Sequence, residues 1–229
     1  MNKKSSKKKA ICILSGGMDS TLASYIAKKQ DNYEIIAVHF NYGQRTEKRE
    51  LQAFRDICAD LEILEKYEID IPFFTQIGAS ALTDKAIDVP TDGVEAGVPI
   101  TYVPFRNGIF LSITAAIAEK EGATAMYIGV VQEDSSGYPD CTDTFINDMT
   151  KAINQGTKDD TNIEILTPLV HLSKAQIVQE AIKLEVPLEH TWSCYKEEDQ
   201  ACGVCDSCRL RLNGFKLANS IDPIPYKAL

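Results

Sequence analysis

Residues 15–20, with the sequence Ser-Gly-Gly-Met-Asp-Ser, have the residue types and order that suit phosphate binding. They follow an apolar run, residues 10–14, that is typical of a strand, and they precede residues 21–27, which are typical of a helix. Two glycines permit a tight turn with positive φ and a close approach to an anion. The helix start supplies unpaired N–H groups and the positive end of its dipole. A glycine turn without a ligand is the alternative interpretation.

Three polar side chains extend the chemistry of this phosphate loop. The hydroxyls of Ser15 and Ser20 are hydrogen-bond donors for phosphate, and the carboxylate of Asp19 is a ligand type that Mg²⁺ prefers. The lysine of the common P-loop pattern, G-x-x-x-x-G-K-[ST], does not occur in this segment. The sequence therefore indicates a phosphate loop of a different class.

Four of the seven cysteines have the spacing of a metal site. Cys194, Cys202, Cys205 and Cys208 are too closely spaced for a set of disulfides, and four thiolates suit tetrahedral zinc. An iron–sulfur cluster is the alternative, although the fourth cysteine lies upstream and no proline follows Cys208. With four protein ligands, one zinc ion per chain is expected to be structural.

The remaining cysteines have no such spacing. Cys12 lies in the first expected strand and Cys58 in an expected helix, so both are interpreted as small core residues. Cys141 ends a polar loop, and whether it is structural or bonds covalently to a substrate stays open.

Strand-like and helix-like segments alternate along the chain, which predicts an α/β fold with a parallel sheet and crossover helices. Strands are expected at residues 10–14, 34–40, 67–71, 125–130 and 163–166. Further helices are expected at residues 46–61, 107–121, 145–154 and 174–184, the last of them capped by Ser173. Residues 72–102, with prolines, glycines and little periodicity, are expected to form a long loop.

Ligands of such sheets bind at the carboxyl ends of the strands. Residues 15–20, 41–45 and 131–141 each follow an expected strand, so these three loops are expected to converge on one crevice.

Composition limits the classes of function. The net charge of −9 over 229 residues disfavours broad binding to nucleic acid or an anionic membrane. The basic block at residues 1–9 is interpreted as a disordered tail, and residues 10–229 as one domain that includes a zinc-binding segment at 190–210. No signal peptide or transmembrane segment is recognised, which predicts a cytoplasmic protein.

Six further motifs sharpen the interpretation of the phosphate loop. Residues 15–20 resemble the pyrophosphatase loop of the N-type ATP pyrophosphatase (PP-loop) superfamily, to which NAD synthetase and GMP synthetase belong. The six other motifs occupy residues 41–45, 80–83, 103–107, 136–141, 191–208 and 222–226. Together with the phosphate loop, they make the chain resemble the 7-cyano-7-deazaguanine synthase family over residues 10–226.

The resemblance implies a doubly wound, mostly parallel five-stranded sheet of the adenine nucleotide alpha hydrolase-like type. It also implies a ligase of queuosine biosynthesis that uses ATP, Mg²⁺ and free ammonia. The enzyme would activate the carboxylate of 7-carboxy-7-deazaguanine, form an amide, and dehydrate it to the nitrile, 7-cyano-7-deazaguanine (preQ0). Members of this family are commonly homodimers, and no stable nucleic-acid partner is implied.

The resemblance also implies roles for individual residues. Asp19 would hold magnesium, and Arg45 and Arg106 would stabilise the substrate carboxylate or the phosphates, with surface ion pairs as the alternative. Asp134 and Asp140 would accept hydrogen bonds from the guanine edge, with Asp140 among the catalytic residues. Tyr138 would stack on the base. As alternatives, Asp140 caps the next helix and Tyr138 shapes the loop. The ATP-binding residues would be Leu14, Ser15, Gly16, Gly17, Met18, Asp19, Ser20, Thr21, Leu22, Ala23 and Ser24, with residues 38–40 near adenine.

Two positions depart from the family pattern. Phe105 stands where a small residue commonly precedes Arg-Asn, and Ser135 stands where an aromatic residue is common. Both are expected in the substrate crevice, where they bear on the identity of the substrate. One alternative function is a related ligase that transfers an activated deazaguanine to another acceptor. Another is a zinc-ribbon nucleic-acid module, which the acidic composition disfavours.

Overall fold

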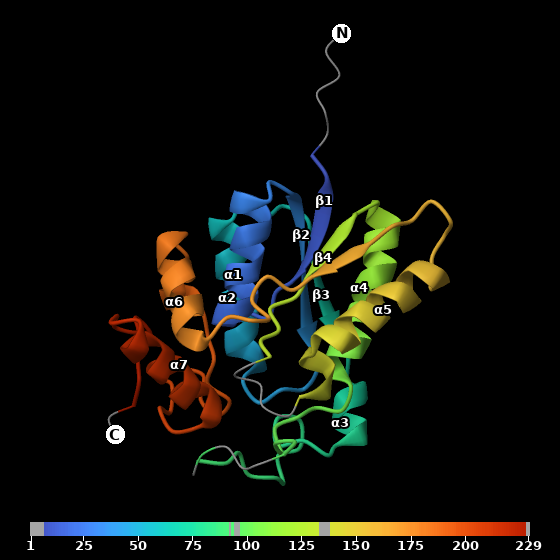
Figure 1. Cartoon of the computed structure of the whole chain (residues 1–229). Coiled ribbons are helices and arrows are strands. Elements are labelled where there is room, and N and C mark those ends of the chain that lie inside the picture. Colours follow the sequence, from blue (N-terminus) through green and yellow to red (C-terminus); the bar gives the residue numbers. More distant parts are fainter. Residues whose placement is uncertain (1–6, 92, 94–96, 133–137, 228–229) are drawn as a thin grey trace.

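The computed structural model covers residues 1–229 and describes all of them except 1–6, 92, 94–96, 133–137 and 228–229. Five strands form one sheet in the order β3-β2-β1-β4-β5, and all four pairings are parallel (Figure 1). The predicted five-stranded parallel sheet is confirmed. The strands are β1 (Lys9–Ile13), β2 (Glu34–Asn41), β3 (Lys66–Asp70), β4 (Ala125–Tyr127) and β5 (Glu164–Leu166).

The central strand β1 explains the two-layered packing of helices. Its side chains alternate between two apolar cores: Ala10 and Cys12 face one, and Ile11 and Ile13 face the other. A strand covered on both faces needs apolar residues at every position, as the run from Ala10 to Ile13 has. β3 lies at an edge and alternates between half-buried and exposed residues, which accounts for its weaker sequence signal.

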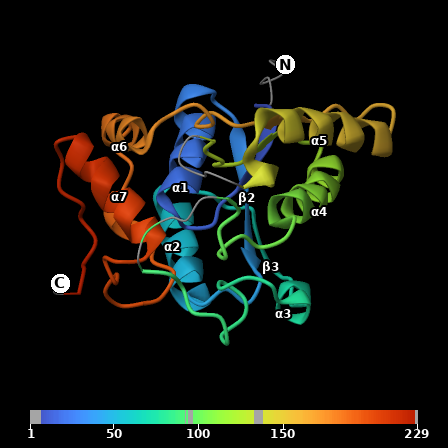
Figure 2. The same ribbon diagram turned by 60° about the horizontal axis from the view of Figure 1, so that its bottom comes forward.

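Helices cover both faces of the sheet, which makes the fold doubly wound (Figure 2). The first core gathers α1 (Met18–Tyr25), α2 (Glu47–Asp60), α6 (Lys174–Lys183) and α7 (Asp206–Leu217). The second core lies against α3 (Phe73–Ile77), α4 (Arg106–Glu121) and α5 (Asp143–Gly156). Three short elements complete the chain: a π-helical turn at Ile26–Gln30 and 3₁₀ turns at Pro139–Cys141 and Leu188–His190.

Three expectations about these elements need correction. The expected loop at residues 72–102 contains the helix α3, and the helix at 174–184 is not the last one, because α7 begins inside the cysteine cluster. β4 is shorter than expected and ends at Tyr127. The predicted cap of α6 is confirmed, since Ser173 and Gln176 form a reciprocal capping box. Among the described residues, no helix has the length and apolar character needed to cross a membrane.

Candidate active site

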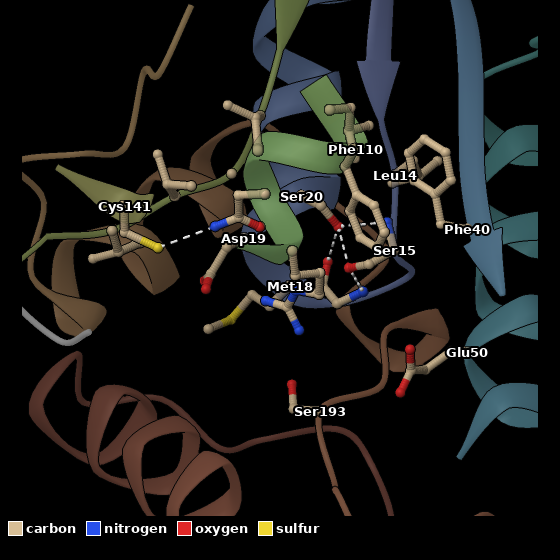
Figure 3. A pocket seen from close by; sticks show the side chains of 18 of the residues that line it. Leu14, Ser15, Met18, Asp19, Ser20, Phe40, Glu50, Phe110, Cys141 and Ser193 are labelled. Atoms are coloured by element: carbon tan, nitrogen blue, oxygen red, sulfur yellow. Dashed lines mark hydrogen bonds between the residues drawn. The ribbon is translucent and has the colours of Figure 1, made fainter. Parts of the chain in front are cut away.

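A pocket of about 270 Å³ lies where β1, β2 and β4 end (Figure 3), a volume near the lower end of small-molecule sites. The three loops expected to converge do meet there: Ser15, Tyr42 and Val131 all line the pocket. The helices α2 and α4 and the segment after residue 191 supply the other walls. The prediction of a single crevice at the carboxyl edge of the sheet is confirmed.

The phosphate loop needs a glycine at one position for a specific reason. Gly16 has a φ of +88°, and a Cβ there would lie 2.6 Å from the backbone oxygen of Glu50. Gly17 instead has a φ of −77° and is the N-cap of α1, so only one of the two glycines adopts the expected positive φ. The hydroxyl oxygens of Ser15 and Ser20 lie 2.9 Å apart and stabilise the turn.

The predicted ATP-binding residues divide into two sets. Leu14, Ser15, Gly17, Met18, Asp19 and Ser20 line the pocket, whereas Gly16 turns the chain behind it. Thr21, Leu22, Ala23 and Ser24 are buried inside α1. The hydroxyl of Thr21 donates to Gly17 O and that of Ser24 to Ser20 O, so both serve the helix rather than the pocket.

Gly129 has a role that the sequence analysis missed. A Cβ at this position would lie 2.6 Å from the backbone nitrogen of Ser20, at the start of α1. The chain after β4 therefore packs directly on the phosphate loop, which only a glycine permits. The position of this glycine at the end of an apolar run was the feature of the sequence that could have indicated a close backbone approach.

Lys174 was also missed, although it contacts a predicted site residue. Its Nζ atom donates to both carboxylate oxygens of Asp19, at 3.1 and 2.9 Å. The lysine stem packs against α7, where a Cβ on Gly214 would lie 2.6 Å from Lys174 Cγ. The first residue of α6 thus places a positive charge beside the phosphate loop. No local sequence pattern indicates that Lys174 pairs with Asp19.

Arg106, the first residue of α4, lines the pocket as a cation. Its Nη1 atom donates to the hydroxyl of Tyr42 at 3.1 Å, and the guanidinium lies 6.0 Å from the ring centroid of Phe110. Burial alone would lower the pKa of Arg106, but the field of Tyr42, Tyr138 and nearby acidic groups raises it above its ordinary value. The arrangement suits recognition of a carboxylate or a phosphate.

Arg45 does not line the pocket. Its guanidinium donates to the backbone carbonyls of Ala81, Asp84 and Ile87, at 2.6, 3.0 and 2.6 Å respectively. In this position Arg45 fixes the segment around residues 81–87 and does not face the cavity that Arg106 lines. Among the described residues it has no carboxylate partner.

Asp140 is buried and caps a helix, but not the helix named in the alternative interpretation. Its Oδ2 atom accepts from the backbone nitrogen of Asn107 in the first turn of α4, at 2.9 Å. The next helix, α5, is capped by Thr142. The side chain of Asn107 donates to Cys141 Sγ at 3.2 Å, and both residues line the pocket.

Of the residues expected around the substrate base, one lines the pocket and the others do not or lie outside the described part of the chain. Tyr138 lines the pocket, and its hydroxyl shares a 2.9 Å hydrogen bond with Thr101. Asp134 and Ser135 lie outside the described residues. Phe105 is half-exposed and packs edge-on against Phe145 rather than lining the pocket, which corrects its expected place in the crevice.

Glu50 of α2 is a pocket residue that the sequence analysis did not single out (Figure 3). Its Oε1 atom accepts from the hydroxyl of Thr46 at 2.7 Å, and its Oε2 atom accepts from the Gln44 amide at 3.2 Å. Burial raises the pKa of the Glu50 carboxyl to about 7. The pocket therefore contains a carboxyl group that changes charge near neutral pH.

The four predicted metal-ligating cysteines come together. The Sγ atoms of Cys194, Cys202, Cys205 and Cys208 all lie within 4.8 Å of one another, and all four residues are buried. Three backbone N–H groups donate to Cys194 Sγ. Hydrogen bonds from the thiols of Cys205 and Cys208, together with such backbone donors, lower the pKa of Cys194. Four converging thiols with N–H donors fit a tetrahedral, thiolate-bound metal ion.

The cysteine segment also builds part of the pocket. The backbone nitrogen of Trp192 donates to Gly16 O at 2.9 Å, and the neighbouring Ser193 lines the pocket. Arg211 of α7 is almost fully buried and donates to the hydroxyl of Ser193 at 3.3 Å. Its guanidinium also forms a bidentate pair with Asp222 at 2.7 and 2.9 Å, so the C-terminal segment positions the pocket wall rigidly.

A family model described as "Queuosine biosynthesis protein QueC" matches residues 9–219. The chain belongs to the QueC family. Among curated relatives, "7-cyano-7-deazaguanine synthase" of Aliarcobacter butzleri (strain RM4018) is 83% identical over 99% of this chain and 99% of that protein. A protein of the same name from Nautilia profundicola is 71% identical over 96% of this chain and 99% of its own length.

The fold of the chain is similar to that of more distant proteins of known structure. The U34-tRNA thiolase NcsA from Methanococcus maripaludis matches with a TM-score of 0.50 and 14% identity, over 94% of this chain and 71% of that one. A protein described as a predicted subunit of tRNA methyltransferase, from Methanocaldococcus jannaschii, also gives 0.50, at 15% identity over 96% and 92% of the two chains. At these identities the likeness concerns the fold alone.

Proposed function

We propose that this QueC protein is a 7-cyano-7-deazaguanine synthase, which converts 7-carboxy-7-deazaguanine and ammonia to the nitrile at the expense of ATP. The observation that carries the proposal is the high identity to proteins of that name over nearly the whole chain. The pocket supports it, because a phosphate loop and the cation Arg106 face one cavity.

The chemistry requires an activated oxygen twice. A carboxylate reacts poorly with ammonia until one oxygen becomes a good leaving group, which adenylation by ATP achieves. Ammonia then displaces the activating nucleotide and gives the amide. A second activation, now of the amide oxygen, allows the loss of that oxygen and the formation of the nitrile. The protein contributes positioning and charge stabilisation.

The described residues suit these tasks. In the proposal, Ser15, Ser20 and the N-terminus of α1 bind the phosphates, Asp19 holds Mg²⁺, and Lys174 adds a positive charge beside them. Arg106 binds the substrate carboxylate and Tyr138 contacts the base. Asp140 acts at a distance in this scheme, because it fixes the start of α4 and so the position of Arg106.

The four cysteines hold one structural zinc ion in the proposal. All four coordination positions come from the protein, so this metal stabilises the C-terminal segment and supplies no open site for a reactant. An iron–sulfur cluster is the competing occupant, and elemental analysis separates the two. We further propose a homodimer, which light scattering during size-exclusion chromatography tests directly.

Product analysis tests the proposed function. The metal-replete protein is incubated with ATP, Mg²⁺, ammonia and 7-carboxy-7-deazaguanine, and the products are identified by mass spectrometry. We expect the nitrile, with the amide as an intermediate in single turnovers. If a folded, metal-replete protein yields neither compound, the proposed function is wrong.

A further inference from the structure

Two carboxyl side chains line the described part of the pocket, those of Asp19 and Glu50. Asp19 is paired with Lys174. The hydrogen bonds to Glu50 come instead from neutral groups, the hydroxyl of Thr46 and the amide of Gln44. Glu50 points toward the cavity from α2 (Figure 3), so it is the carboxyl group that is available for proton exchange with a reactant.

The hydrogen bonds of Thr46 accommodate both protonation states of Glu50. Thr46 Oγ1 lies 2.7 Å from Glu50 Oε1 and 3.1 Å from the backbone oxygen of Cys194, yet its hydroxyl has one hydrogen. When Glu50 is ionised, Thr46 donates to the carboxylate. When Glu50 is protonated, its own O–H donates to Thr46 Oγ1, and Thr46 donates to the Cys194 carbonyl. A proton can therefore come and go without leaving Glu50 unpartnered.

The surroundings of Glu50 place this exchange near neutral pH. Burial is the main cause of the raised pKa, to about 7, and Glu47 on the same helix acts in the same direction. Arg106, on α4, and the hydrogen bonds from Thr46 and Gln44 act in the opposite direction. Burial raises the pKa of Tyr42 to about 12, so at pH 7 Tyr42 is neutral and adds no charge beside Glu50. A base with a pKa near the working pH is the most effective one.

The proposed reaction releases a proton that needs an acceptor. When ammonia attacks the activated carboxyl, a C–N bond forms, the C–O bond to the nucleotide breaks, and the nitrogen must lose one proton to become a neutral amide. We propose that Glu50 is the general base of the pocket: its carboxylate accepts this proton, and the products are the amide, the nucleotide and a protonated Glu50. This inference rests on the proposed function.

The test separates activation of the carboxylate from attack by ammonia. Without ammonia, pyrophosphate release that depends on 7-carboxy-7-deazaguanine reports activation alone. Rapid-quench measurement of amide formation, at a fixed concentration of free NH₃ across pH, reports the second step. The variants are Glu50→Gln, which cannot accept a proton, Glu50→Asp, which retains a carboxyl group, and Asp56→Asn as a control further along α2, where the carboxylate accepts from Gln52 outside the pocket.

We expect Glu50→Gln to keep activation within about threefold of the unsubstituted protein and to slow amide formation by about 100- to 10,000-fold, the usual contribution of general-base catalysis. Its pH profile should lack the limb near pH 7 that the unsubstituted protein shows. Glu50→Asp should retain that limb at a reduced rate. Asp56→Asn should resemble the unsubstituted protein in both steps.

Two outcomes would overturn the role of Glu50. One is amide formation by Glu50→Gln within about tenfold of the unsubstituted rate, which is below the usual effect of losing a general base. The other is an equal loss of activation and amide formation, which indicates a structural role. Failure of the unsubstituted protein to activate the carboxylate would instead refute the proposed function. Metal content and thermal unfolding of each variant verify its fold.

Discussion

Lys174 Nζ forms a bidentate ion pair with Asp19, with N–O distances of 3.1 and 2.9 Å, although the two residues are 155 positions apart. The pair joins the start of α6 to the phosphate loop and leaves the lysine side chain mostly buried. The pair therefore holds the charge of Lys174 beside the phosphate loop.

The first prediction concerns this pair. Asp19→Ala should abolish turnover with the fold intact, because the proposed Mg²⁺ ligand is lost. Lys174→Met should lower kcat by about 100-fold or more, the usual cost of losing a group that stabilises developing charge. Lys183→Met, at the far end of α6 where the lysine pairs with an exposed Glu180, is the control. Steady-state kinetics with circular dichroism measures both effects, and full activity of Asp19→Ala would remove Asp19 from the site.

The second prediction concerns the metal. Elemental analysis should find about one zinc per chain, as expected for a single four-cysteine site. Cys205→Ser should lose the metal and a large part of the stability, since zinc binding contributes on the order of 10 kcal/mol in zinc-finger peptides. Cys58→Ala, a core change outside the cluster, should retain the zinc. Iron in the purified protein would contradict the assignment.

The third prediction concerns the buried pair of Arg211 and Asp222. Either Arg211→Met or Asp222→Asn alone should lower the free energy of unfolding by about 3–5 kcal/mol, because each leaves an uncompensated buried partner. The double variant should lose less than the sum of the two single losses. Urea denaturation measures all three values. Strict additivity would show that the pair does not act as a unit.

The fourth prediction is a pH dependence of stability caused by Glu50. Its pKa is about 7 in the folded protein against 4.5 for the unperturbed group, so between these values the folded state binds more protons than the unfolded state. Stability should therefore fall as the pH rises through this window. Relative to the unsubstituted protein, Glu50→Gln should gain on the order of 1–3 kcal/mol between pH 5 and pH 8.

Denaturation at both pH values measures the difference, and Asp56→Asn serves as the matched control because its side chain does not line the pocket and is not among the groups that shift the pKa of Glu50. An equal effect of Glu50→Gln at the two pH values would contradict the raised pKa.

The fifth prediction concerns Gly129. Gly129→Ala should place a Cβ 2.6 Å from the backbone nitrogen of Ser20 and displace the phosphate loop. We expect a loss of about 1–3 kcal/mol in stability, typical of overpacking, and a raised KM for ATP. Gly156→Ala is the control, because a Cβ there would meet no atom within 4 Å. An unchanged KM for ATP would show that the loop tolerates the displacement.

Local patterns in the sequence predicted most of the fold. The apolar runs predicted all five strands, and the Ser173 cap predicted the start of α6. α7 was missed because its first residues belong to the cysteine cluster, where the spacing of ligands conceals the helical pattern. α3 has five residues, too few for a helical period to show.

The site was predictable where its residues are contiguous. The phosphate loop and the four cysteines each lie in a short segment, so their residue types and spacing were sufficient to predict that the loop reaches the pocket and that the cysteines converge. Lys174 and Gly129 acquire their roles from contacts with distant segments, which local sequence patterns do not reveal. Glu50 bonds to its neighbours Thr46 and Gln44, but it lies in the wall of a pocket that distant segments complete. For Arg45 the residue type was misleading. A guanidinium suits an anion, but in the structure that of Arg45 donates its hydrogen bonds to backbone carbonyls.

The hydrogen bond from Trp192 to Gly16 joins an early segment of the chain to a late one, so the pocket cannot be completed until most of the chain has been translated. Residues 15–20 leave the ribosome long before residue 192 is synthesised. At that stage the glycine turn lacks both the hydrogen bond from Trp192 and the part of the pocket wall that Ser193 supplies. A chain interrupted before residue 191 would carry the phosphate loop without a closed pocket. The pocket of a growing polypeptide is thus complete only after residues 192 and 193, which directly precede the cysteine cluster, have been synthesised.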